Sequence, residues 1–147
     1  MRTFLFPLAL FAALGCATQH GGSSSAPNNW GDNGLWAVLE AQDHRNTQGL
    51  CALLGDSSVA VREAAALAFA SVQDSASVPC LLKALADPSS SVRSNAVLAL
   101  AFVADSSTVE RMAEAAVSER DTMVERAYLS ASFIAMQRNG LLKDPNA

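Results

Sequence analysis

The residues best able to do chemistry, the histidines and cysteines, are few and widely spaced. His20 and His44 are the two histidines, and they belong to no metal-ligand spacing. There is no Gly-x-Ser-x-Gly elbow and no phosphate-binding loop. Acidic residues near the C-terminal end fall mostly at the edges of predicted helices, where ordinary solvated acid accounts for them: Glu110, Glu114, Glu119 and Asp121. We therefore infer no enzyme, no metal site and no cofactor.

Two of the three cysteines, Cys51 and Cys80, fall in predicted helices of adjacent repeats. In an oxidising compartment they could pair. The chain contains a 31-residue repeat, described below. When its copies are aligned, however, Cys51 matches Leu82 while Cys80 matches Gly49. The two side chains are therefore expected to face different ways, on helices whose axes lie about 8 to 10 Å apart. Two free thiols, one of them buried, is the preferred interpretation, and pairing stays open.

The third cysteine, Cys16, follows an N-terminal segment typical of exported proteins. A basic residue precedes an apolar run that is too short to span a bilayer comfortably, which predicts a signal peptide over residues 1–15. The sequence Ala13-Leu14-Gly15-Cys16 resembles the lipobox of bacterial lipoproteins, with Ala13 and Leu14 in reversed order. The resemblance implies cleavage before Cys16 and acylation of that residue. A plain secretory leader cut near Ala17 is the alternative.

A lipid-anchored flexible linker is predicted over residues 16–34. Several acyl chains on Cys16, as the lipoprotein resemblance implies, would anchor the chain more firmly than a single chain does. Ala17 stands where an aspartate would favour the inner membrane, so the resemblance implies the outer membrane of a bacterial envelope. The following Gly, Ser, Asn and Pro residues lack apolar periodicity and form a tether. Trp30 is the exception, either docked on the first helix or exposed.

Composition narrows the partners of the 147-residue chain. Half of its residues are apolar, few are aromatic and the formal charge is -4. No stretch is strongly basic, so the electrostatic footprint of a nucleic-acid binder is missing. Abundant alanine favours closely packed helices over a sheet.

Two copies of one 31-residue unit run from Asp56 to Asp105. A fixed period of this length, with helical spacing inside it, is the signature of stacked helix pairs. The residues that recur are Asp56, Val61, Arg62, Ala65, Leu67, Ala68, Ala70, Val72 and Asp74, at positions 87, 92, 93, 96, 98, 99, 101, 103 and 105.

The repeat register predicts a folded domain over residues 35–140 and a C-terminal tail over 141–147. The segment 35–43 matches a lone second helix and predicts a half repeat that caps the stack. Helix pairs are then expected at 48–54 with 59–72, 78–86 with 91–103, and 109–117 with 122–137, and Asn139-Gly140 is a helix-stop signal.

The residues Val61–Asp74 followed by Val78–Asp87 resemble the HEAT-like repeat first catalogued in phycobilin lyases. The resemblance covers about residues 35–139 and implies an all-α fold, a short right-handed α-solenoid of about three HEAT-like helix pairs preceded by a half repeat.

The same resemblance implies a structural ladder between stacked units, made by an aspartate and the arginine six residues later. Asp56 with Arg62 and Asp87 with Arg93 match it. The third unit has Ser118 and Val124 at these places, so the ladder is expected to stop there.

One column of the repeat departs from the family. In the family this position lies on the inner, concave face and is usually polar, yet here it is apolar in every unit, as Trp36, Leu67, Leu98 and Leu129. A second apolar column lies four residues later on the same helical face, as Phe102 and Phe133. Such a stripe is a predicted partner-binding groove. The alternatives are cover by the chain itself, through Leu141-Leu142 or Trp30, ordinary core packing, and self-association into a homodimer.

The sequence thus favours a non-catalytic, membrane-tethered interaction module, a scaffold or adaptor for a protein or peptide partner at the periplasmic or outer-membrane side of a bacterial envelope. The alternative is a carrier or chaperone for an apolar small ligand, such as an acyl chain or tetrapyrrole, held in the concave groove.

Overall fold

The computed structural model describes residues 32–138 and 140, and in this part the chain is helical without a strand. The predicted all-α class and short α-solenoid are confirmed. The predicted leader, Cys16, Trp30 and the tail 141–147 lie outside the described residues. The elements are α1 (Asn33–Asp43), α2 (Thr47–Leu53), α3 (Val59–Val72), the 3₁₀ turn η2 (Ser75–Ser77), α4 (Val78–Ala84), α5 (Ser90–Ala101), α6 (Ser106–Ser118) and α7 (Thr122–Arg138).

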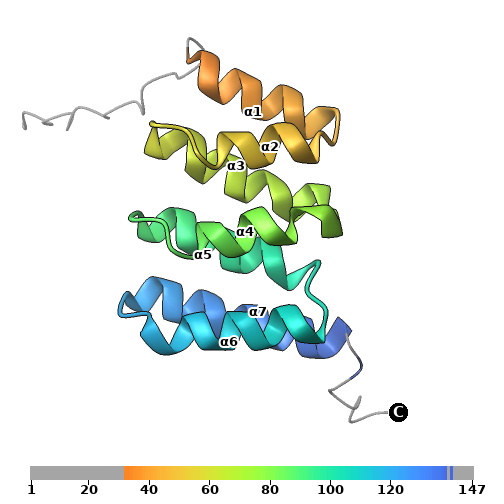
Figure 1. The fold of residues 1–147 in the computed structure, drawn as a ribbon, viewed down its shortest axis with the longest axis vertical. Coiled ribbons are helices and arrows are strands. Elements are labelled where there is room, and N and C mark those ends of the chain that lie inside the picture. The colour runs from red at the N-terminus through yellow and green to blue at the C-terminus, as the bar shows by residue number, and fades with distance from the viewer. Residues whose placement is uncertain (1–31, 139, 141–147) are drawn as a thin grey trace, which may run out of the picture.

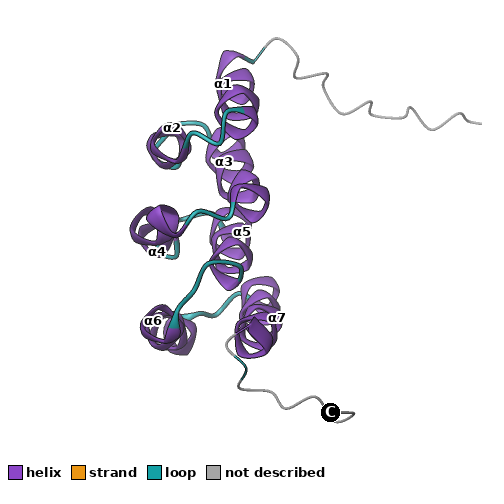
Figure 2. Ribbon diagram, turned by 90° about the vertical axis from the view of Figure 1, so that its right-hand side faces the viewer, coloured by secondary structure: helices purple, strands orange, loops and turns teal. Residues whose placement is uncertain are grey.

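The helices stack in two layers (Figures 1 and 2). Helices α1, α3, α5 and α7 form one row, which we call the inner layer, and α2, α4 and α6 form the other, the outer layer (Figure 2). Within the described residues α1 has no outer-layer helix before it, which is the predicted half repeat. We call the surface of the inner layer that points away from the outer layer the inner face.

The core lies between the two layers and between successive inner helices. Alanine is its commonest residue, and small side chains let neighbouring inner helices approach closely. A few larger apolar side chains fill the space between the layers. They are fully buried: Leu50, Phe69, Leu81, Val92, Val97, Leu100 and Val124.

Aspartates set several helix starts by accepting hydrogen bonds from the free amides of the first turn. Asp32 accepts from the amides of Gly34 and Leu35 at 2.8 and 3.3 Å, so α1 begins at Asn33, two residues before the predicted start. Asp105 likewise accepts from the amide of Thr108 at 2.8 Å and starts α6 at Ser106, three residues before the predicted position.

Two arginines form rungs between successive units. Arg62 Nε donates to Asp87 Oδ2 of the next unit at 2.8 Å, and its Nη1 donates to the carbonyl of Asp56 at 2.9 Å. Arg93 repeats the arrangement with Glu119 at 2.8 Å. Each arginine therefore ties the backbone of its own unit to a carboxylate of the next.

The prediction that the ladder stops at the third unit is wrong. Ser118 stands at the aspartate position, but Glu119 comes one place later and its longer side chain reaches Arg93. That hydrogen bond, with others from the amides of Asp121 and Arg120, lowers the pKa of Glu119 to about 2. The rung therefore depends on a carboxylate near the helix start and not on its exact repeat position.

The preference for free thiols is also wrong, because Cys51 and Cys80 form a disulfide between α2 and α4, with a Cα–Cα distance of 5.7 Å. Equivalent helices in a stack touch through opposite sides. Two residues that meet across the contact must therefore occupy different repeat positions, as Cys51 and Cys80 do. The mismatch in repeat position that argued against pairing is what pairing in a solenoid requires.

Candidate functional site on the inner face

The first apolar column lies on the inner face. In α3, Leu67 is two residues from buried Ala65 and from buried Phe69, about 200° around the helix from each. Leu67 is 57% exposed, and its equivalents Trp36 and Leu129 are 51% and 74% exposed. Three inner helices therefore present a large apolar side chain to solvent at the same repeat position.

Two of the predicted contact residues are less accessible. Leu98 is half-buried and packs against the core. Phe102 is half-buried too, and it is the C-cap of α5 because that helix ends at Ala101, two residues before the predicted end at Val103. The stripe is consequently interrupted at α5.

Two exposed apolar residues extend the inner face beyond the predicted set. Leu39 is 45% exposed and follows Trp36 by three residues, and Met136 is 39% exposed and follows Phe133 by three. Phe133 itself is 56% exposed. The three-residue spacing was the signal for both, since residues three apart are neighbours on a helix surface.

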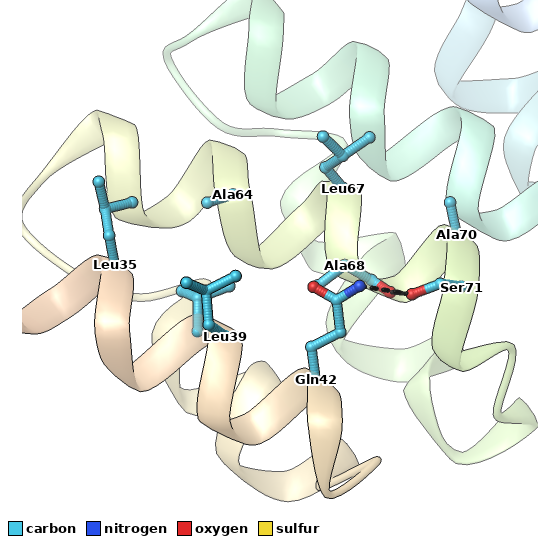
Figure 3. A pocket seen from close by; sticks show the side chains of 9 residues that line it. Leu35, Leu39, Gln42, Ala64, Leu67, Ala68, Ala70 and Ser71 are labelled. Atoms are coloured by element: carbon cyan, nitrogen blue, oxygen red, sulfur yellow. Dashed lines mark hydrogen bonds between the residues drawn. The ribbon is translucent and has the colours of Figure 1, made fainter. Parts of the chain in front are cut away.

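A pocket of about 600 Å³ opens between α1 and α3 on this surface (Figure 3). Its walls are mostly aliphatic, and Leu35 and Leu39 of α1 lie across from Ala64 and Leu67 of α3 (Figure 3). The full lining is Leu35, Val38, Leu39, Gln42, Ala64, Leu67, Ala68, Ala70 and Ser71.

One end of the pocket is polar. Gln42 Nε2 donates to Ser71 Oγ at 2.9 Å, and Ser71 Oγ donates to the carbonyl of Ala68 at 2.8 Å. The amide oxygen of Gln42 points away from Ser71 (Figure 3). The pocket thus combines an apolar recess with an amide acceptor at its edge.

Small side chains at two repeat positions coincide with the pocket. Ser71 has phenylalanine as its equivalent in both later units, Phe102 and Phe133. Ala64 has Asn95 as its equivalent in the next unit, where the asparagine Nδ2 donates to the carbonyl of Glu63 at 3.2 Å. The later junctions therefore carry larger side chains where the first junction has Ala and Ser.

Acidic residues outnumber basic ones on the two helices that form the pocket. Helices α1 and α3 carry Glu40, Asp43 and Glu63, and their one basic residue, Arg62, is held by Asp87. Glu40 is one turn after Trp36 and Glu63 is one turn before Leu67, so both lie on the inner face.

The α7 end of the inner face differs in charge. On α7, Arg126 is exposed beside one acid, Glu125. Arg138 is nine residues after Leu129, on the opposite side of α7, and its Nη1 donates to the carbonyl of Ala101 at 3.3 Å. The inner face therefore carries an excess of acid at α1 and α3 and a balanced pair of charges at α7.

The residues first considered for chemistry do not converge. The ring Nδ1 of His44 lies 2.9 Å from the carbonyl oxygen of Glu40, at the end of α1. Glu110 and Glu114 are exposed on α6, while Glu119 belongs to the ladder. Across residues 32–138 and 140, no three His, Cys, Asp or Glu side chains are grouped as a metal site would need.

In the same part of the chain, no helix is both long and apolar enough to cross a membrane.

In a comparison with known protein families, residues 47–132 match the family described as HEAT repeats. The matched segment contains α2 to α6 and most of α7, and with them both rungs of the ladder. No curated protein matches the chain.

Proposed function

The chain belongs to the HEAT repeat family, and we propose that it is a membrane-tethered interaction module whose inner face holds a protein partner. Proteins of this kind use the extended surface of the stacked repeats to bind other proteins. The observation that carries the proposal is the exposure of Leu67 and Leu129 at one repeat position. Repetition places such side chains in register, so a partner can contact several helices at once.

The exposed apolar surface is what a partner would cover. Large apolar groups in a row are costly to leave in water and are typical of interaction sites when they gather in one patch. Trp36 and Phe133, both more than half exposed, add the aromatic side chains that often dominate binding energy. Within the described residues the inner face therefore has the composition of an interface.

Membrane tethering is part of the proposal. We infer that Cys16 becomes the acylated first residue and that residues 16–34 link it to the repeats, with the outer membrane as the expected location. The disulfide between Cys51 and Cys80 supports an oxidising compartment, because such bonds are rare in the cytosol. Labelled palmitate should be incorporated into the wild type and not into Cys16→Ser. Equal labelling of the two proteins would contradict the anchor.

Crosslinking in intact envelopes, followed by affinity capture, tests the interaction itself. The double variant Leu67→Ser/Leu129→Ser should lose the specific crosslinked species while its melting temperature stays close to that of the wild type, since both side chains are mostly exposed. Val117→Ser is the matched control, because Val117 is 88% exposed on α6 in the outer layer. Equal loss in the control would contradict the inner face as the binding surface.

A carrier for an apolar small ligand is the second candidate, and the pocket between α1 and α3 favours it. Its volume of about 600 Å³ lies within the range of ligand sites. Extraction of the purified protein with organic solvent, followed by mass spectrometry, decides the matter. One equivalent of a co-purifying lipid or tetrapyrrole, lost from Ser71→Phe, would establish the carrier.

A further inference from the structure

We propose that the pocket between α1 and α3 receives a large apolar side chain from a basic peptide segment of the partner. This inference rests on the proposed function and names the chemistry of the partner. The pocket would hold the anchoring residue, while Glu40 of α1 and Glu63 of α3, which lie on the inner face outside the pocket lining, would meet lysine or arginine side chains that flank it.

The shape of the pocket suits an anchoring side chain. At about 600 Å³ it has room for an aromatic or long aliphatic group, and its walls are formed by leucine, valine and alanine side chains. It opens on the inner face, between two helices that both carry exposed apolar residues, Trp36 and Leu67. A side chain in the pocket would therefore continue into contacts outside it, as the central anchor of an interface does.

The polar edge of the pocket suits a peptide. The hydrogen bond from Gln42 to Ser71 uses the amide nitrogen and leaves the Gln42 amide oxygen directed away from Ser71 (Figure 3). An oxygen in this position can accept from the main-chain N–H next to an anchoring residue. A free acyl chain offers no such donor beside its apolar part.

Charge selects the class of partner. Glu40 is exposed and Glu63 half-buried, and neither forms an ion pair within the described residues. The two nearby arginines are engaged elsewhere. Arg62 pairs with Asp87. Arg45, two residues after α1, donates to the carbonyl of Val72. It also lies close to Asp74, whose pKa is lowered by a hydrogen bond from Thr47 and by the charge of Arg45. A basic peptide is attracted to this part of the inner face, whereas an acidic peptide or an anionic lipid headgroup is repelled.

A fluorescence anisotropy titration tests the proposal with the full-length protein in zwitterionic detergent, with protein-free micelles as the blank. The probe is a labelled twelve-residue peptide with a central phenylalanine flanked by lysines. Two matched peptides replace the lysines by glutamates or the phenylalanine by alanine. We expect the lysine–phenylalanine probe to bind, and each replacement to weaken binding by about tenfold or more.

Variants locate the site. Ser71→Phe places in the pocket the residue that the next two units carry at this position, and we expect it to lower affinity about tenfold with little change in melting temperature. Glu40→Gln/Glu63→Gln should lower affinity about fivefold at low salt, and the difference should vanish near 1 M salt, where screening acts over about 3 Å. Glu125→Gln is the control, because Glu125 holds the repeat position of Glu63 on α7.

Several results would overturn the inference. They are equal binding of the glutamate peptide, full affinity in Ser71→Phe, or a loss in Glu125→Gln as large as that in Glu40→Gln/Glu63→Gln. The inference would also be overturned if the lysine–phenylalanine probe bound only to the Trp30→Ala variant, because Trp30 itself would then be the occupant of the pocket. A probe displaced by self-association would make a second copy the occupant, through its Arg126. If the crosslinks that depend on Leu67 and Leu129 persist in Ser71→Phe and the probe binds this variant with unchanged affinity, the pocket is not the anchoring site, but the proposed function still holds.

Discussion

The two ends of the inner face come from the same repeat yet offer different surfaces. At the α1–α3 end, Ala64 and Ser71 are small and a pocket of about 600 Å³ opens. At the α7 end the same positions hold Arg126 and Phe133, and Phe133 is 56% exposed. The repeat sets the position of each side chain. Different residues at a few of these positions give a recess at one end, which is the pocket between α1 and α3, and a ridge at the other, formed by Arg126 and Phe133 of α7.

The charge follows the same division. The helices of the recess carry Glu40 and Glu63, whereas α7 carries the oppositely charged pair Glu125 and Arg126. The rung from α3 to the next unit and the rung from α5 to the last unit are nearly the same, with Arg62–Asp87 and Arg93–Glu119 each at 2.8 Å. The conserved geometry of the scaffold therefore carries a surface that changes along its length.

The largest expected difference is in the free energy of unfolding, between a variant of the core residue Phe69 and a variant of the ridge residue Phe133. Phe69→Ala should lower the free energy of unfolding by about 3–5 kcal/mol, because Phe69 is 1% exposed and the change leaves a cavity. Phe133→Ala should change it by about 0.5 kcal/mol or less, as exposed side chains do. Urea denaturation followed by circular dichroism measures both. A comparable loss in Phe133→Ala would show that the ridge is core.

Removing the disulfide between α2 and α4 should have the next largest effect. Cys51→Ser/Cys80→Ser should cost about 3 kcal/mol, because the bond closes a loop across a sequence separation of 29 residues. Thermal denaturation with and without reductant measures it. Alkylation of both thiols before reduction, or an unchanged melting temperature under reductant, would show that the two cysteines are not paired.

Leu67 and Leu98 should respond differently although they hold one repeat position. Leu98→Ser is expected to cost about 1–2 kcal/mol, because Leu98 is half-buried against the core. Leu67→Ser should cost about 0.5 kcal/mol or less, since Leu67 is 57% exposed. Equal costs in urea denaturation would mean that the column is uniformly buried or uniformly exposed.

The smallest expected effect concerns the second rung of the ladder, the ion pair between Arg93 and Glu119. The Arg93 hydrogen bond lowers the pKa of Glu119 from 4.5 to about 2, so the ionised carboxylate stabilises the folded state fully above pH 4.5. That contribution, about 1 kcal/mol, should be lost as the pH falls towards 2. Glu119→Gln should be less stable than the wild type near neutral pH, and the difference should shrink in acid. A difference independent of pH would contradict the rung.

Much of the fold was readable from the repeat. Its period predicted the order of the helices and the initial half repeat, because stacking requires equivalent residues to bury equivalent surfaces. The disulfide was missed because Cys51 and Cys80 were compared as equivalent positions, whereas facing sides of stacked helices are not equivalent. Glu119 was missed because the register placed Ser118 at the rung.

The candidate site was only partly readable. The exposed column was visible at Trp36, Leu67 and Leu129. Its interruption was not, since the burial of Leu98 depends on how closely α5 packs against its neighbours. The pocket depends on the joint effect of small residues on two helices, and its one signal in the sequence was the serine at position 71 where later units have phenylalanine.

The most direct test of the inner face as a partner-binding surface is site-specific photocrosslinking in living cells. A photoreactive amino acid at position 67 or 129 should give the same discrete crosslinked partner, because both positions are exposed on the inner face. The same probe at position 117, which is exposed on the outer layer, should give none. Crosslinks confined to position 117, or absent from both inner positions, would contradict the account.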